Sequence, residues 1–159
     1  MVFKMKKLPL WLKNYEILAT GPNCGLIEVI NDARSIDEIH KMSVTLLDYF
    51  IVQHGNGRVR SRRFKKAQKN FCYSLAAYSL AQYVLAIKDR HNGNIMIDSE
   101  GHIIHIDFGF LLSNAPGKGL KFEQAPFKLP QEYINVLGGV KSKYYRLFRD
   151  LIKLGFMAL

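Results

Sequence analysis

The chain has 159 residues, of which 48% are hydrophobic and 23% charged, so it can bury a core and is too apolar for a disordered protein. Its 23 Lys and Arg against 13 Asp and Glu give a formal net charge of +10. This excess favours a polyanionic partner such as nucleotide phosphates, nucleic acid or an anionic membrane face. Two cysteines are too few for a disulfide framework and indicate a reducing compartment. Residues 8–12 are too short and Pro-interrupted for the apolar part of a signal peptide.

The N-terminal third predicts a β-hairpin. Residues 15–20 and 26–30 are apolar enough for strands, and the turn-forming cluster at 21–25 separates them. Taken by itself, the second strand carries no sign of a binding role.

The middle and the end of the chain predict helices. Ser35 and Glu38 form a capping box that begins a short helix ending at Met42, and a second short helix covers residues 46–52. Residues 64–88 predict one long helix, uncharged from 71 to 87, which is either a buried core helix or a membrane span. Its polar side chains, and a length below about 20 apolar residues, favour a buried central helix. Residues 131–137 and 142–154 predict two further helices, the last with a basic face that lies in solvent or on a membrane.

A basic run lies at residues 54–63, where a Gly-Asn-Gly loop precedes four arginines. The run does not fit a Gly-x-Gly-x-x-Gly phosphate loop. It is either an anchor on anionic lipid, worth roughly 1 kcal/mol per basic residue, or a solvated loop, and we favour the loop.

Residues 88–94 and 103–109 hold the candidate chemistry. A strand, a four-residue turn and a second strand separate Asn94 from Asp107, so the chain folds back and the two side chains can approach each other. Amide and carboxylate oxygens suit Mg²⁺, with phosphate oxygens completing its coordination. Asp89 and His91 are then placed to handle the proton of an attacking hydroxyl, and either of the two can be the base.

The remaining polar residues of this segment predict mostly structural roles. We expect Arg90 to form a structural ion pair and Asp98 to be a turn residue with no further role. His102 and His105 lie on a half-buried strand and are expected to be structural, and Lys88 either reaches a phosphate or ends the helix favourably.

Asp-Arg-His-x-x-Asn at 89–94 followed by His-Ile-Asp-Phe-Gly at 105–109 resembles the catalytic core of the phosphoinositide lipid kinases. The strings at 87–96 and 101–110 resemble the type III phosphatidylinositol 4-kinases, the beta-like type slightly more than the alpha-like, and the likeness spans residues 10–139. It implies an α+β, protein-kinase-like fold. Residues 1–31 would be the end of the N-terminal lobe and the hinge, with a short β-hairpin. Residues 32–159 would be most of the helical C-terminal lobe, with a β-hairpin that carries the metal ligands.

The resemblance also implies an activity: ATP-dependent phosphorylation of phosphatidylinositol at the 4-hydroxyl. A class III-like phosphatidylinositol 3-kinase and a catalytically inactive nucleotide-binding relative stay as alternatives, as does a basic membrane- or nucleic-acid-binding module without chemistry. The implied cofactors are ATP and Mg²⁺. The implied site residues are Asp89, His91, Asn94 and Asp107 for catalysis, Asn94 and Asp107 for the metal, and Glu28, Val29 and Ile30 for adenine.

Residues 107–129 would be the segment that selects the lipid headgroup. Its few lysines, Lys118, Lys121 and Lys128, favour a ring without phosphates, since several cations are needed to pair phosphates. The expected partners are phosphatidylinositol in a membrane, ATP and regulatory or adaptor proteins, and no nucleic acid. The expected location is cytoplasmic, peripheral on Golgi or other endomembranes.

One departure from the family pattern matters. The fourteen residues before the first strand contain neither a glycine-rich loop nor a lysine on a strand that could pair the nucleotide phosphates. We therefore expect this chain alone to transfer phosphate very poorly.

Overall fold

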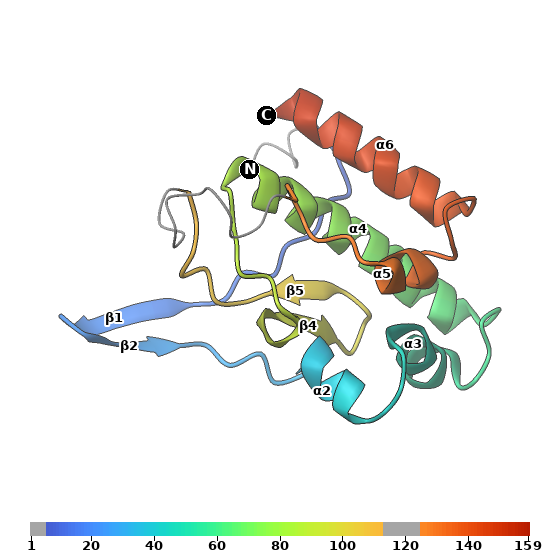
Figure 1. Ribbon diagram of the computed structural model, residues 1–159, viewed down its shortest axis with the longest axis horizontal. Coiled ribbons are helices and arrows are strands. Elements are labelled where there is room, and N and C mark those ends of the chain that lie inside the picture. The colour runs from blue at the N-terminus through green and yellow to red at the C-terminus, as the bar shows by residue number, and fades with distance from the viewer. Residues whose placement is uncertain (1–5, 113–124) are drawn as a thin grey trace.

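The computed structural model describes residues 6–112 and 125–159, which form an α+β fold of helices and small antiparallel sheets (Figure 1). Part of the predicted headgroup-selecting segment, with Lys118 and Lys121, lies outside the described residues. The elements in chain order are β1 Ile17–Gly21, β2 Cys24–Ile27, β3 Ala33–Ser35, α2 Ile36–Lys41, α3 Leu46–Gly55, α4 Arg62–Val84, the 3-10 turn η1 Asn92–Asn94, β4 Ile95–Asp98, β5 Ile103–His105, α5 Gln131–Val136 and α6 Lys143–Ala158.

The long helix α4 is the centre of the molecule, and α3, α6 and β5 pack against it (Figure 1). Phe71 of α4 meets the rings of Phe50 and Tyr133 edge-on, at 5.4 and 5.6 Å between centroids, and all three rings are fully buried. Such pairs add to the stabilisation that the buried area itself provides. The predicted central helix is confirmed, although it ends earlier than residue 88, because Ala86 has a left-handed φ of 47°. Within residues 6–112 and 125–159, no helix is both long and apolar enough to cross a membrane.

The sheet that carries the site has the order β3-β4-β5, with both pairs antiparallel. The predicted hairpin of β4 and β5 is confirmed, with Ile95 paired to His105 at one end and the turn at the other. Gly101 closes this turn at φ 86°, and a Cβ there would collide with Ala67 of α4. The turn therefore needs glycine both for its backbone conformation and for its contact with the central helix.

The β1–β2 hairpin extends away from the helical body (Figure 1). Its apolar residues Ile17, Leu18, Leu26 and Ile27 are each 60–65% exposed. The predicted hairpin is confirmed, but β2 ends at Ile27. The prediction that residues 28–30 continue the strand is therefore wrong. They form an extended connection toward β3 instead.

Side-chain caps fix where the helices begin. Both predicted partners of the Ser35 capping box are in place, with Ser35 Oγ accepting from Glu38 N at 3.1 Å and Glu38 Oε2 from Ser35 N at 2.8 Å. Helix α3 begins with a second box at Thr45 and continues to Gly55, three residues beyond the predicted end. His54 is consequently a buried residue of α3 and not part of a loop.

Candidate active site

The loop between α4 and η1 is held by Arg90, whose side chain is buried. Its guanidinium donates to the carbonyls of Lys88 at 2.8 Å and Ile106 at 2.7 Å, and also to the carbonyl of Asp107. The structural role predicted for Arg90 is confirmed, but these partners are backbone carbonyls rather than the carboxylate expected of an ion pair. Arg90 thereby joins the loop that carries Asp89 to the segment that carries Asp107.

Asn94 and Asp107 lie on either side of the β4–β5 hairpin, at its open end. The amide of Ile106 donates to the carbonyl of Asn94 at 3.1 Å, so Asp107 is one residue from a direct backbone contact with Asn94. Asn94 Nδ2 donates to the carbonyl of Asp89 at 3.0 Å, which leaves Oδ1 as the free acceptor of this amide. Asp107 Oδ1 accepts from Gly109 N at 3.2 Å, and the carboxylate is exposed.

These two oxygen donors fit a divalent cation that takes only a few protein ligands. Within the described residues, no group of three or more His, Cys, Asp or Glu side chains could hold a metal ion by itself. An amide and a carboxylate at the same end of one hairpin match Mg²⁺, which commonly keeps water and substrate phosphates as its other ligands.

Asp89 and His91 form the acid–imidazole pair that the sequence predicts to lie together. His91 Nε2 lies 3.9 Å from Asp89 Oδ2, and His91 Nδ1 accepts from Gly93 N at 3.1 Å. With Nδ1 as acceptor, the neutral ring carries its proton on Nε2, facing Asp89. Asp89 itself has a left-handed φ of 61°, a backbone conformation that is uncommon for a residue other than glycine.

A mainly apolar cavity of about 700 Å³ opens beside this site. Glu28, Val29 and Ile30, the residues expected at adenine, line it together with Asp107. Glu28 is fixed to the start of the hairpin, because its amide donates to the Glu16 carbonyl at 2.9 Å. Sequence reasoning did not assign the other lining residues, which are Tyr15, Ile17, Ile27, Met96, Ile106 and Phe108. Three of them, Met96, Ile106 and Phe108, lie in the strings at 87–96 and 101–110 that carry the family resemblance.

The family model of "Phosphatidylinositol 3- and 4-kinase" matches residues 1–156. The chain belongs to the phosphatidylinositol 3- and 4-kinase family. Its fold is therefore protein-kinase-like as well as α+β, as the resemblance implied.

The curated proteins that are similar to this chain include phosphatidylinositol 4-kinases of several organisms. Phosphatidylinositol 4-kinase PIK1a of Candida albicans is 52% identical, over 99% of this chain and 18% of the relative. Phosphatidylinositol 4-kinase of Dictyostelium discoideum is 48% identical, over 98% of this chain and 13% of the relative. Phosphatidylinositol 4-kinase beta of Rattus norvegicus is 44% identical, over 99% and 19%. The chain thus spans less than a fifth of the length of these relatives.

Lys128, a residue of the segment predicted to select the headgroup, contacts the loop that carries Asp89 and His91. Its Nζ donates to the Arg90 carbonyl at 2.8 Å and to Asn92 Oδ1 at 2.6 Å. Asn92 in turn contacts His40 Nδ1 at 3.3 Å, and His40 Nε2 contacts Glu132 at 2.9 Å. This chain of contacts connects the loop to α2 and α5. The sequence gives no sign of it, because its members are far apart along the chain.

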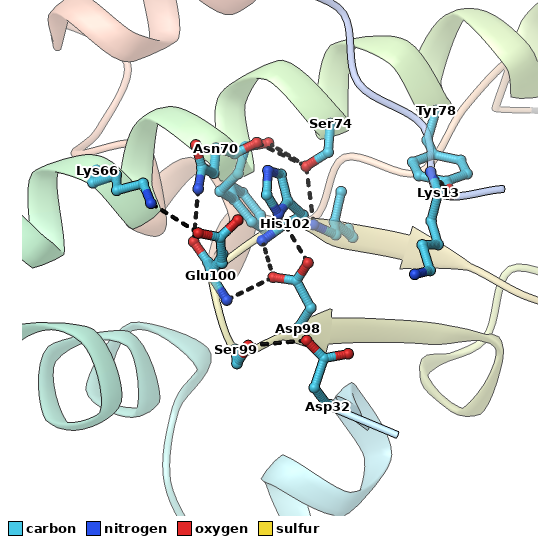
Figure 2. A network of polar contacts seen from close by, with 12 residues as sticks. Lys13, Asp32, Lys66, Asn70, Ser74, Tyr78, Asp98, Ser99, Glu100 and His102 are labelled. Atoms are coloured by element: carbon cyan, nitrogen blue, oxygen red, sulfur yellow. Dashed lines mark hydrogen bonds and ion pairs between the residues drawn. The ribbon is translucent and has the colours of Figure 1, made fainter. Parts of the chain in front are cut away.

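The turn of the β4–β5 hairpin holds a second Asp–His pair, formed by Asp98 and His102. The prediction that Asp98 has no role beyond the turn is wrong. His102 Nδ1 lies 2.8 Å from Asp98 Oδ2 (Figure 2), and both side chains are buried. Trp11 stacks on the imidazole at 3.9 Å between ring centroids. Burial by itself would raise the pKa of Asp98. The side-chain and backbone hydrogen bonds from His102, and one from the Glu100 amide, outweigh burial and lower that pKa. Asp98 is thus a buried structural carboxylate.

His105, at the open end, is buried without such a partner. Its ring stacks on Tyr78 at 4.5 Å between centroids, and within the described residues neither ring nitrogen has a hydrogen-bond partner. Burial, reinforced by the charges of Arg90 and Lys128, lowers the pKa of His105 to about 3. His105 is therefore neutral at physiological pH, and the prediction that it is structural agrees with its burial.

Proposed function

We propose that this chain provides the hinge and most of the C-terminal lobe of a phosphatidylinositol 4-kinase, which transfers the γ-phosphoryl group of ATP to the inositol 4-hydroxyl. In this proposal residues 1–31 form the end of the N-terminal lobe and the hinge, and residues 32–159 form the C-terminal lobe. The single observation that carries the proposal is the position of Asp107. This carboxylate, adjacent to Asn94, also lines the cavity formed by residues 28–30.

The hinge segment would hold the adenine edge through its backbone. The Glu28 carbonyl and the Ile30 amide offer one acceptor and one donor, with Val29 between them, and the apolar cavity wall would cover the faces of the ring. Adenine placed there would share its cavity with Asp107.

Asn94 Oδ1 and the Asp107 carboxylate would hold Mg²⁺, which when bound neutralises phosphate charge and orients the γ-phosphoryl group. Asp89 would accept the proton of the attacking inositol hydroxyl. His91 would stabilise the Asp89 charge through Nε2, since its Nδ1 is engaged by the Gly93 amide. Arg90 and Lys128 would hold these groups in place without touching substrate.

The first test is metal-dependent nucleotide binding by the 159-residue chain, measured with a fluorescent ATP analogue. We expect binding that strengthens with Mg²⁺ and loses this dependence in an Asn94→Ala/Asp107→Asn variant. The matched control, Asp150→Asn, removes an exposed carboxylate of α6 and should bind like the parent chain. Nucleotide binding by the double variant that still rises with Mg²⁺ would contradict the assigned ligands. No binding by the parent chain would contradict the hinge assignment.

The second test is position-resolved analysis of the lipid product made by the full-length kinase that contains this chain. The 4-hydroxyl is supported by the identity to three proteins named phosphatidylinositol 4-kinase. A 3-phosphorylated product would favour the class III-like alternative. No product, with nucleotide binding intact, would favour the inactive relative.

We also propose that the protein works peripherally on cytoplasmic endomembranes, because its lipid substrate is there.

A further inference from the structure

Basic residues are concentrated around the start of α4, in a stretch that overlaps the basic run at residues 54–63. Residues 58–69 contain seven Lys or Arg and no acidic residue. Four of these cations lie in or directly before the first turn of α4, where the helix dipole already contributes positive charge and where the turn itself contains no acidic residue. Such an arrangement destabilises the free protein and favours an anion nearby.

Two polar cavities adjoin this helix end, and we name them together the turn-end cavity. The larger, of about 360 Å³, lies between β3, α3 and the β4–β5 turn, and the smaller, of about 190 Å³, lies over α4. Both are lined by His54, Arg63 and Ser99, so they adjoin each other. The larger is also lined by Asn31, Asp32, Ala33, Arg34, Tyr49 and Gln53. The turn-end cavity lies at the opposite end of the hairpin from Asp107.

The carboxylates at this cavity are occupied by partners within the fold (Figure 2). Asp32 accepts from Ser99 Oγ at 3.0 Å, and Glu100 pairs with Lys66 at 2.8 Å. Arg34 and Arg63, in contrast, make no ion pair with any carboxylate of residues 6–112 and 125–159. The guanidinium groups of Arg34 and Arg63 therefore remain available to an anion. Each can bind an anion in a planar, bidentate manner.

A buried polar atom at the same place gives independent support. His54 is only 5% exposed, and its Nε2 has no hydrogen-bond partner in the described part of the chain. A buried nitrogen without a hydrogen-bond partner is energetically unfavourable, so a ligand that accepts from it is favoured. Burial lowers the pKa of His54 most, Asp98 raises it and Arg63 lowers it, so the ring is neutral in the free protein.

We propose that the turn-end cavity binds a phosphate group between Arg34 and Arg63, with His54 as the buried donor. The phosphate belongs to a soluble phosphate ester or to the headgroup of a membrane lipid. A volume of about 360 Å³ admits a headgroup or a small ester. The site is separate from the nucleotide cavity and does not depend on the function proposed above.

The test follows amide and imidazole NMR signals of the full 159-residue chain during titration with inorganic phosphate and then glycerol 3-phosphate. We expect the signals of Ser99 and His54 to shift and the pKa of His54 to rise with bound phosphate, because an adjacent anion favours imidazolium. The other charged or titratable groups near His54 are the same with and without bound phosphate. They are Asp32, Arg34, Tyr49, Arg63, Lys66, Asp98 and Glu100.

Three variants and one pair of vesicle preparations complete the test. Arg34→Gln and Arg63→Gln should each weaken phosphate binding roughly tenfold, whereas Arg60→Gln, in the same basic run but outside the cavity lining, should bind like the parent. Phosphatidylcholine vesicles with and without phosphatidic acid identify the source. Binding to phosphatidic acid that Arg63→Gln weakens more than Arg60→Gln assigns a lipid headgroup, and binding of the ester alone assigns a soluble ligand. Equal loss in Arg60→Gln and Arg63→Gln, or no shift at Ser99 and His54 with any probe, would overturn the proposal.

Discussion

The two ends of the β4–β5 hairpin carry the same residue types in opposite states. At the turn, Asp98 and His102 are buried, 2.8 Å apart and covered by Trp11. At the open end, Asp89 and His91 are 3.9 Å apart, with side chains that are 32% and 59% exposed. A buried, fully hydrogen-bonded pair fixes its protons and stabilises the turn, while a loose, solvent-facing pair can exchange them. Residue type alone therefore does not distinguish a structural Asp–His pair from a catalytic one.

The largest effect should come from Asp89→Asn in the full-length kinase. Losing the proton acceptor should lower kcat by about 10²–10⁴-fold, while the thermal unfolding midpoint stays that of the parent, because Asp89 is partly exposed. Lipid phosphorylation assays and calorimetry on the same preparation measure both. Parent-like activity would show that the open-end pair is not the catalytic one.

Asp98→Ala should give the reverse result. Removing the carboxylate takes the hydrogen-bond acceptor from the His102 ring, the His102 amide and the Glu100 amide, and we expect the free energy of unfolding to fall by about 3 kcal/mol. Urea denaturation of the 159-residue chain gives this value. Glu100→Ala, which removes the exposed pair with Lys66 from the same turn, is the control and should change stability by less than about 1 kcal/mol. Equal losses in the two variants would contradict a special role for Asp98.

The effect that is smallest at neutral pH concerns His105, the last residue of β5. The pKa of His105 is about 3 when folded against an ordinary 6.5, so an unfolded chain takes up the proton first as pH falls. Its contribution is complete above pH 6.5 and declines toward about pH 3, with a slope of at most about 1.4 kcal/mol per pH unit. His105→Phe, which can still stack on Tyr78, should flatten the slope between pH 6.5 and about 4, above the range in which Asp98 is protonated.

Urea midpoints at several pH values test this slope. The pKa of His54 is also lowered, so His54 too makes the free energy of unfolding fall as the pH falls. Because it does so in the parent chain and in His105→Phe alike, the comparison isolates His105. An unchanged slope in His105→Phe would show that His105 does not account for the loss of stability in acid.

Local patterns gave the elements of this fold, and long-range contacts decided their ends. The Ser35 capping box and the β4–β5 hairpin depend on neighbouring residues, so the sequence predicts both. The three-residue strand β3 was missed, since it exists only through its pairing with β4. The end of α3 was placed too early because His54 is polar by type and becomes buried only when tertiary packing covers it.

The candidate site likewise has residues that the sequence identifies and residues that only long-range contacts reveal. The Asp89–Asn94 string and Asp107 were found through a family resemblance, which encodes a spatial arrangement that spacing alone leaves open. Asp98 could not be assigned, because its significance depends on Trp11, which lies far away in sequence and stacks on the partner of Asp98. The support from Lys128 through Asn92 is likewise a product of the folded chain.

The carbonyl contacts of Arg90 have a mechanical consequence. One guanidinium holds the backbone next to Asp89 and at Asp107, so the proposed proton acceptor and the proposed metal ligand are tied together. In the proposed kinase, a movement of the β1–β2 hairpin would then change the position of the nucleotide without disturbing the alignment of Asp89 and Asp107. Control of such an enzyme is more easily exerted on the opening of the cleft than on the chemistry inside it.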